Sequence, residues 1–89
     1  MPTIRFTNRL NRHVNCPTST VQGATVLEVL NAYFDTNSQI RGYVLDECDS
    51  LRQHMAIFVD GEPIANRHNL HQRIDETSTV DVIQALTGG

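Results

Sequence analysis

One amphipathic helix stands out in this sequence, and it constrains the fold more than any other feature. Thr25 and Glu28 have the spacing of a capping box, in which the two side chains bond the free N–H groups of the first helical turn. Apolar side chains follow at helical spacing, at Val26, Val29, Leu30, Tyr33 and Phe34. Residues 35–38 are polar turn formers that end the helix. A helix with one wide apolar face needs another layer, here a sheet, to cover it.

Strand patterns precede this helix. Residues 3–7 alternate apolar and polar side chains, as a half-buried strand does, and residues 13–16 alternate again after a polar turn. Pro17 has no backbone N–H to donate, so it ends the second strand or lies at its edge. The two segments together predict an N-terminal β-hairpin.

More strand patterns follow the helix, after a weaker stretch at 40–52 that fits a short helix or an ordered loop. Residues 55–59 form a continuous apolar run, which is typical of a strand buried on both faces. The Asp-Gly pair at 60–61 predicts a tight turn into a short return strand at 62–64, whose proline confines it to a sheet edge. Residues 79–84 have the pattern of a last strand.

This order of elements predicts an α+β domain with a β-grasp (ubiquitin-like) fold. The connection through the helix is long enough to return a parallel strand, so the first and last strands become central neighbours. The expected sheet is mixed and has four to five strands, with one main helix packed on one face. We expect the domain to cover residues 1–86 and residues 87–89 to form a flexible C-terminal tail.

Charge and composition argue against several classes of function. The 89 residues carry a net charge of −3 and contain no basic run, which argues against nucleic-acid binding. No stretch approaches the roughly 18 apolar residues of a membrane span, and no signal-peptide pattern is present. We therefore expect a cytoplasmic protein that does not act in a membrane. Cys16 and Cys48 are then expected to be reduced thiols.

The sequence holds no signature of an enzyme active site. It lacks a glycine-rich phosphate loop, a nucleophile-elbow serine and a CxxC pair. His68 and His71 have the spacing of two metal ligands on one helical face, but no further side chain completes a ligand set. We therefore expect no catalytic residue, no metal site and no tightly bound cofactor.

Gly88 and Gly89, the last two residues, suggest a different chemistry. Glycine has no Cβ, so the pair is able to enter a narrow channel of another protein and present the terminal carboxylate there. A partner that uses ATP would convert this carboxylate to an acyl-adenylate. Sulfide or a persulfide would then displace AMP and leave a thiocarboxylate. The protein is in that case a carrier and co-substrate, whereas a loose chain end without chemistry is the alternative.

Two segments resemble the MoaD/ThiS family of ubiquitin-like sulfur carriers, in its longer MoaD-like type. Residues 51–62 are similar to the family's strand that ends in an Asn/Asp-Gly-Glu turn, and residues 84–89 to its apolar approach to a Gly-Gly end. The helix that starts at Thr25 also matches the family's capped helix, so the similarity extends over residues 2–89.

The resemblance implies site residues and partners. A ubiquitin-activating-type adenylyltransferase would form the adenylate, and then the thiocarboxylate, on Gly89, while Gly88, Thr87 and Leu86 thread or brace the tail in that partner. ATP is used by the activating partner. The other implied partners are a sulfurtransferase or persulfide donor and a sulfur-accepting synthase, such as molybdopterin synthase, of which this chain would be a non-catalytic subunit.

The chain departs from the family at two places. Residues 77–80 replace a Gly-Asp-Glu-Val-like turn, and residues 40–52 are longer than in compact members. The receiving pathway therefore stays open among molybdopterin, thiamine and cysteine biosynthesis. Two other functions also stay open: a protein modifier joined to lysines through Gly89, and a non-covalent β-grasp interaction module.

Overall fold

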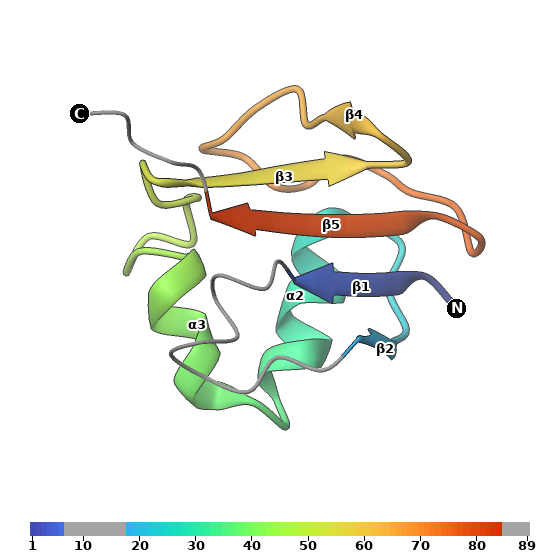
Figure 1. The fold of residues 1–89 in the computed structure, drawn as a ribbon, viewed down its shortest axis with the longest axis horizontal. Helices are drawn as coiled ribbons and strands as arrows, with labels where there is room; N and C mark the ends of the chain where they lie inside the picture. The colour runs from blue at the N-terminus through green and yellow to red at the C-terminus, as the bar shows by residue number, and fades with distance from the viewer. Residues whose placement is uncertain (7–17, 85–89) are drawn as a thin grey trace.

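The structure is a computed structural model that describes residues 1–6 and 18–84. Its strands are β1 (Thr3–Phe6), β2 (Ser19–Thr20), β3 (Met55–Val59), β4 (Glu62–Pro63) and β5 (Thr79–Gln84). They form one sheet in the order β2-β1-β5-β3-β4, as Figure 1 shows. β5 runs parallel to β1 and antiparallel to β3. The last strand is therefore the central strand of a mixed sheet, as the sequence predicts.

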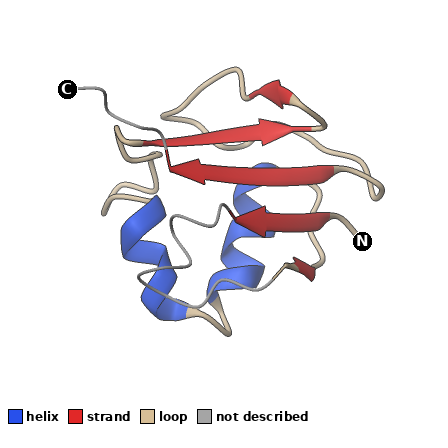
Figure 2. Ribbon diagram, in the orientation of Figure 1, coloured by secondary structure: helices blue, strands red, loops and turns tan. Residues whose placement is uncertain are grey.

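Two helices accompany the sheet in the described part of the chain (Figure 2), namely α2 (Val26–Phe34) and α3 (Ser38–Val44). The start of α2 confirms the predicted cap, because Oγ1 of Thr25 accepts the N–H of Glu28 at 3.2 Å. The Glu28 carboxylate accepts in return from Ala24, at 3.1 Å, one residue earlier than a standard capping box. α3 overlaps the stretch 40–52, for which the sequence fits a short helix or an ordered loop, and it begins two residues earlier, at Ser38, within the predicted turn.

Loss of the α2 cap is expected to weaken the fold measurably. Thr25→Ala removes the side-chain acceptor and leaves the Glu28 N–H without it, so we expect a loss of about 1 kcal/mol in the free energy of unfolding. Thr25→Ser keeps the hydroxyl, and its free energy of unfolding is expected to stay within a few tenths of a kcal/mol of the wild-type value. Urea denaturation of the three proteins measures the difference, and equal stabilities for Ala and Ser would contradict it.

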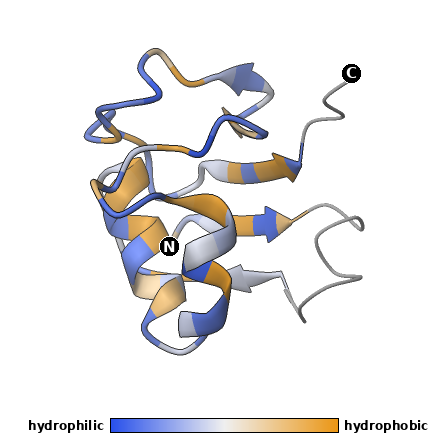
Figure 3. Cartoon of the chain, turned by 90° about the vertical axis from the view of Figure 1, so that its left-hand side faces the viewer, coloured by the Kyte–Doolittle hydropathy of each residue, from blue (hydrophilic) through white to orange (hydrophobic). Residues whose placement is uncertain are grey.

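The hydrophobic core lies between the helices and one face of the sheet. Ile4, Val80 and Val82 point to this face and are fully buried, because alternate side chains of a strand share a face. The bands of hydrophobic and hydrophilic colour along the strands in Figure 3 show the same alternation. Phe6 closes the core against Tyr33, with ring centroids 4.8 Å apart. A mixed sheet with a capped helix packed on one face is the predicted β-grasp arrangement.

The prediction that residues 55–59 are buried on both faces is wrong. Met55 and Ile57 are about 1% exposed, but Ala56 and Phe58 are only half-buried. The helices cover one face of the sheet, so the other side of β3 keeps contact with solvent. A continuous apolar run does not by itself show how many faces of a strand are covered.

The N-terminal hairpin is confirmed only in part. β1 pairs antiparallel with β2 through Thr3↔Thr20 and Ile4↔Ser19, so the described pairing lies after the proline at 17. The expected strand at 13–16 lies outside the described residues.

The predicted tight turn joins β3 to β4. Asp60 and Gly61 both have positive φ, at 52° and 87°, as a two-residue turn between antiparallel strands requires. Phe58 pairs with Pro63 across it, and β4 is the edge strand, as the proline predicts.

Candidate functional site

The four predicted site residues, Leu86, Thr87, Gly88 and Gly89, lie outside the described residues. The boundary expected between a domain at 1–86 and a tail at 87–89 lies there as well. The roles assigned to these residues, and the boundary, therefore stay predictions. The structure does describe the strand from which this segment continues, and that strand ends at Gln84.

β5 pairs with β1 over residues 79–82 and with β3 over residues 80–84. Toward β1 it forms the pairs Ile4↔Val80 and Phe6↔Val82, and toward β3 its last residue pairs as Met55↔Gln84. β5 ends at the left of Figure 1, beside the first residue of β3. The base of the C-terminal segment is thus fixed on the central strand, next to the segment that leads into β3.

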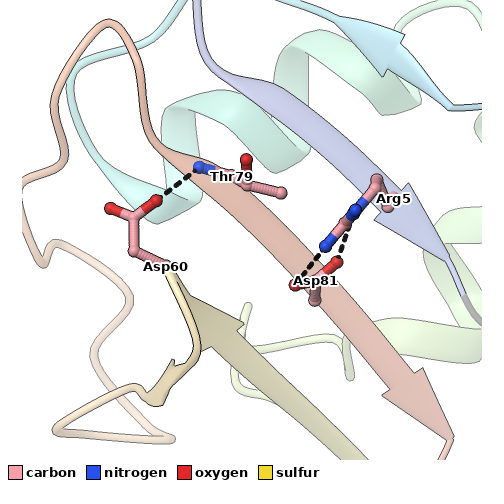
Figure 4. A network of polar contacts seen from close by, with 4 residues as sticks. All are labelled: Arg5, Asp60, Thr79 and Asp81. Carbon is pink, nitrogen blue, oxygen red and sulfur yellow. Dashed lines mark hydrogen bonds and ion pairs between the residues drawn. The ribbon is translucent and has the colours of Figure 1, made fainter.

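An ion pair ties β5 to β1 in the middle of the sheet. Arg5 and Asp81 are register partners and form a two-pronged contact, with Nε to Oδ1 at 2.7 Å and Nη2 to Oδ2 at 3.0 Å (Figure 4). The hydrogen bonding to Asp81, and the negative charge of the Asp81 carboxylate, raise the pKa of Arg5. Because the two residues alternate with the buried Ile4 and Val80, they lie on the sheet face away from the core.

A second contact fixes the other end of β5. Oδ1 of Asp60 accepts the N–H of Thr79 at 2.9 Å, and the Asp60 N–H donates to the Thr79 carbonyl, also at 2.9 Å (Figure 4). The β3–β4 turn therefore holds the first residue of β5. The strand is positioned at its start, along its sides and at its end, so the residues that follow it start from a fixed point.

The described residues do not assemble a metal-binding cluster of three His, Cys, Asp or Glu side chains. His68 and His71 lie in the irregular segment between β4 and β5, so the helical face that two such ligands would share does not form. Cys48 is exposed, and Cys16 lies outside the described residues. No helix in the described part of the chain has both the length and the apolar character to cross a membrane.

One feature of this end of the sheet was not predicted from the sequence. Arg52 and His54, which precede β3, line a hollow together with Arg67 and His68, which follow β4. The two pairs are 13 or more positions apart in the sequence, so no local spacing pattern brings them together.

Comparison with known proteins gives a family and several structural neighbours. The model of the ThiS family matches residues 8–89. No curated protein matches the chain. Solved structures similar to it include the three that follow, each at low sequence identity.

The first is a chain of the Amycolatopsis orientalis BexX/CysO complex, with 20% identity over 100% of both chains and a TM-score of 0.83. SAMP1 from Haloferax volcanii is 19% identical over 99% of this chain and 98% of its own, with a TM-score of 0.80. Mycobacterium tuberculosis CysO is 19% identical over 97% of this chain and 100% of its own, with a TM-score of 0.81. At these identities the solved structures show a shared fold.

The family model covers nearly all of the chain, including β5 and the Gly-Gly end. The β-grasp fold agrees with the structural neighbours. The sequence resemblance is thereby confirmed, and the chain belongs to the ThiS family within the MoaD/ThiS group of ubiquitin-like proteins.

Proposed function

We propose that this protein is a sulfur carrier whose working group is the carboxylate of Gly89. An oxygen of this carboxylate attacks the α-phosphorus of ATP on a ubiquitin-activating-type adenylyltransferase, and pyrophosphate leaves. Hydrosulfide then attacks the acyl carbon, the bond to AMP breaks, and loss of a proton leaves the thiocarboxylate. When a persulfide supplies the sulfur, the product is an acyl disulfide, and a thiol reduces it to the thiocarboxylate.

The observation that carries this proposal is the position of the Gly-Gly pair relative to β5. The pair follows Gln84 by only four positions, and Gln84 is the end of a central strand that is paired on both sides. Two residues without a Cβ at the end of such an arm suit a narrow active-site channel of a partner. Leu86 and Thr87 would brace the arm at the entrance.

The protein acts in this proposal as a co-substrate and not as a catalyst. Arg5, Asp60 and Asp81, on and beside the central strand, are engaged in holding the sheet. The chemistry is therefore assigned to the adenylyltransferase, a persulfide donor or sulfurtransferase, and a synthase that accepts the sulfur. The similarity to a chain of the BexX/CysO complex supports a function that involves binding to partner proteins. The receiving pathway is the synthesis of molybdopterin, thiamine or cysteine.

Intact-mass measurement tests the proposal. The full chain is incubated with the adenylyltransferase of the same organism, ATP and sulfide, and we expect a mass increase equal to the exchange of one oxygen for one sulfur. Fragmentation is expected to place the change on Gly89. The same mixture without ATP is the control. An unchanged mass, with an adenylyltransferase that loads its own known carrier, would contradict the proposal.

A second candidate function is that of a protein modifier joined to lysines through Gly89. The structural similarity to SAMP1, a small archaeal modifier protein, favours it. It begins with the same adenylate and differs in the acceptor, which is an amine and not a sulfur species. Peptides that carry a C-terminal remnant of this chain on a lysine of another protein would support it. A non-covalent module, the third candidate, would keep its function after removal of Gly89.

A further inference from the structure

A hollow of about 610 Å³ lies at the end of the sheet where β5 finishes. Its walls come from the residues that precede β3, among them Arg52 and His54, and from the loop after β4, with Arg67 and His68. The first residue of β3, Met55, pairs with Gln84, the last residue of β5. The hollow therefore adjoins the base of the C-terminal arm.

Backbone carbonyls hold both guanidinium groups of this hollow in place. Nη2 of Arg67 donates to the carbonyl of Arg52 at 2.7 Å and to that of Gln53 at 3.3 Å. Nε of Arg52 donates to the carbonyl of Gly42 at 2.6 Å. A guanidinium has five N–H donors, so these bonds orient each group and leave donors for another molecule. The groups are positioned before any ligand arrives, which lowers the entropy lost on binding.

The loop that carries His68 is held in a similar way. Oδ1 of Asn66 accepts the N–H of His68 at 2.8 Å and that of Asn69 at 3.1 Å. The carbonyl of Arg67 accepts the N–H of Leu51 at 2.9 Å, which joins the two walls. The four basic side chains thus belong to segments that are tied to each other.

Positive charge exceeds negative charge in the hollow, although the whole chain has a net charge of −3. Asp46 is the one carboxylate among the lining residues, and its Oδ1 already accepts the N–H groups of Cys48 at 2.8 Å and Ser50 at 3.0 Å. These backbone bonds, with smaller contributions from Arg52 and His68, lower the pKa of Asp46. The neighbouring Asp49 is paired with Arg41 outside the hollow.

We infer that this hollow binds carboxylate side chains on an acidic surface of the protein that takes up the C-terminal arm. The inference rests on the proposed function, because the arm is the reason for that partner to approach this end of the sheet. Fixed arginines bind carboxylates through paired N–H donors. The negative charge of Asp46, in the wall of the hollow, repels a compact dianion such as phosphate. It repels single carboxylates that are spread over a protein surface less strongly.

Kinetics of loading test the inference with a matched pair of variants. His68→Glu adds a negative charge to the hollow, while His71→Glu makes the same change three positions away, at an exposed residue that does not line it. We expect His68→Glu to raise the KM of the adenylyltransferase for this carrier about tenfold at low salt with kcat unchanged, since charge pairs at an interface mainly act on association. His71→Glu is expected to change KM less than twofold, and added salt should reduce the difference.

A second measurement needs no partner. Amide chemical shifts of the full chain are followed during titration with a glutamate hexapeptide and, separately, with inorganic phosphate. We expect the peptide to move the signals around Arg52, Arg67 and His68, and the His68→Glu variant to lose the effect.

The outcomes separate this inference from the proposed function. If the wild-type chain is never loaded, the sulfur-carrier proposal fails, and the peptide titration still decides whether the hollow binds carboxylates. Normal loading with equal KM values for the two variants would overturn the inference. Stronger binding of phosphate than of the peptide would also overturn it, because the hollow would then be a phosphate site.

Discussion

Deletion of Gly89 is expected to abolish thiocarboxylate formation while the protein stays folded. Without Gly89 the terminal carboxylate belongs to Gly88 and lies one residue closer to the domain, so it does not reach the position of the reaction. A misplaced reacting group is expected to lower the rate at least ~100-fold. β5 ends at Gln84, so no strand residue is lost. Loading is measured by intact mass with the activating partner, and the fold by circular dichroism and urea denaturation.

Gly89→Ala is the matched variant for this deletion. It keeps the chain length and the carboxylate but adds a Cβ. It therefore distinguishes the effect of a shorter C-terminal arm from the effect of a bulkier last residue in a narrow channel. We expect it to be loaded more slowly than the wild type and faster than the deletion variant. Undiminished loading of the deletion variant would contradict both the assignment of Gly89 and the sulfur-carrier proposal.

Leu30→Ala is expected to produce the largest loss of stability. The Leu30 side chain is fully buried in α2, and truncation of such a leucine removes apolar contacts and leaves a cavity, at a cost of about 2–5 kcal/mol. A domain of 89 residues has a total stability of roughly 4–13 kcal/mol, so the variant loses a large share of it. The free energy of unfolding from urea denaturation checks the value.

Leu27→Ala makes the same chemical change three residues earlier in the same helix. Leu27 is only partly buried and packs at the border of the core, so we expect no more than about half of the Leu30 effect. Leu27 lies in the first turn of α2 and Leu30 near its middle, but leucine and alanine differ little in intrinsic helix preference, so burial dominates the comparison. Equal losses for the two variants would show that burial in the core does not decide the stability of α2.

Local chemistry predicted the elements that depend on few residues. The Thr25 cap is recognisable because a hydroxyl and a carboxylate stand at the spacing of a capping box. The Thr25 hydroxyl bonds the Glu28 N–H as expected, whereas the Glu28 carboxylate bonds Ala24, one residue before the expected partner. The Asp60-Gly61 turn was recognisable because positive φ at two successive positions favours these residue types. The central place of the last strand follows from the order of the elements, since the long connection through the helix allows a later strand to return parallel to the first.

Features that depend on distant parts of the chain could not be predicted in this way. Ala56 and Phe58 have the composition of buried residues, and only the absence of a covering layer on their side of the described sheet leaves them half-buried. The basic hollow requires Arg52 and Arg67 to meet, and their contact is set by backbone carbonyls in segments that are irregular in structure. The tail residues were assigned from the sequence and the family, and their assignment awaits the loading experiment.

The double pairing of β5 has a mechanical consequence. A partner that grips the C-terminal arm and pulls along it loads β5 in shear, against β1 on one side and β3 on the other. In this geometry the hydrogen bonds of both ladders share the load at once, whereas a strand peeled from a sheet edge loses them one after another. The residues that follow Gln84 are thus joined to a strand whose two ladders share such a load, and under the proposed function we expect the fold to survive repeated capture by partner proteins.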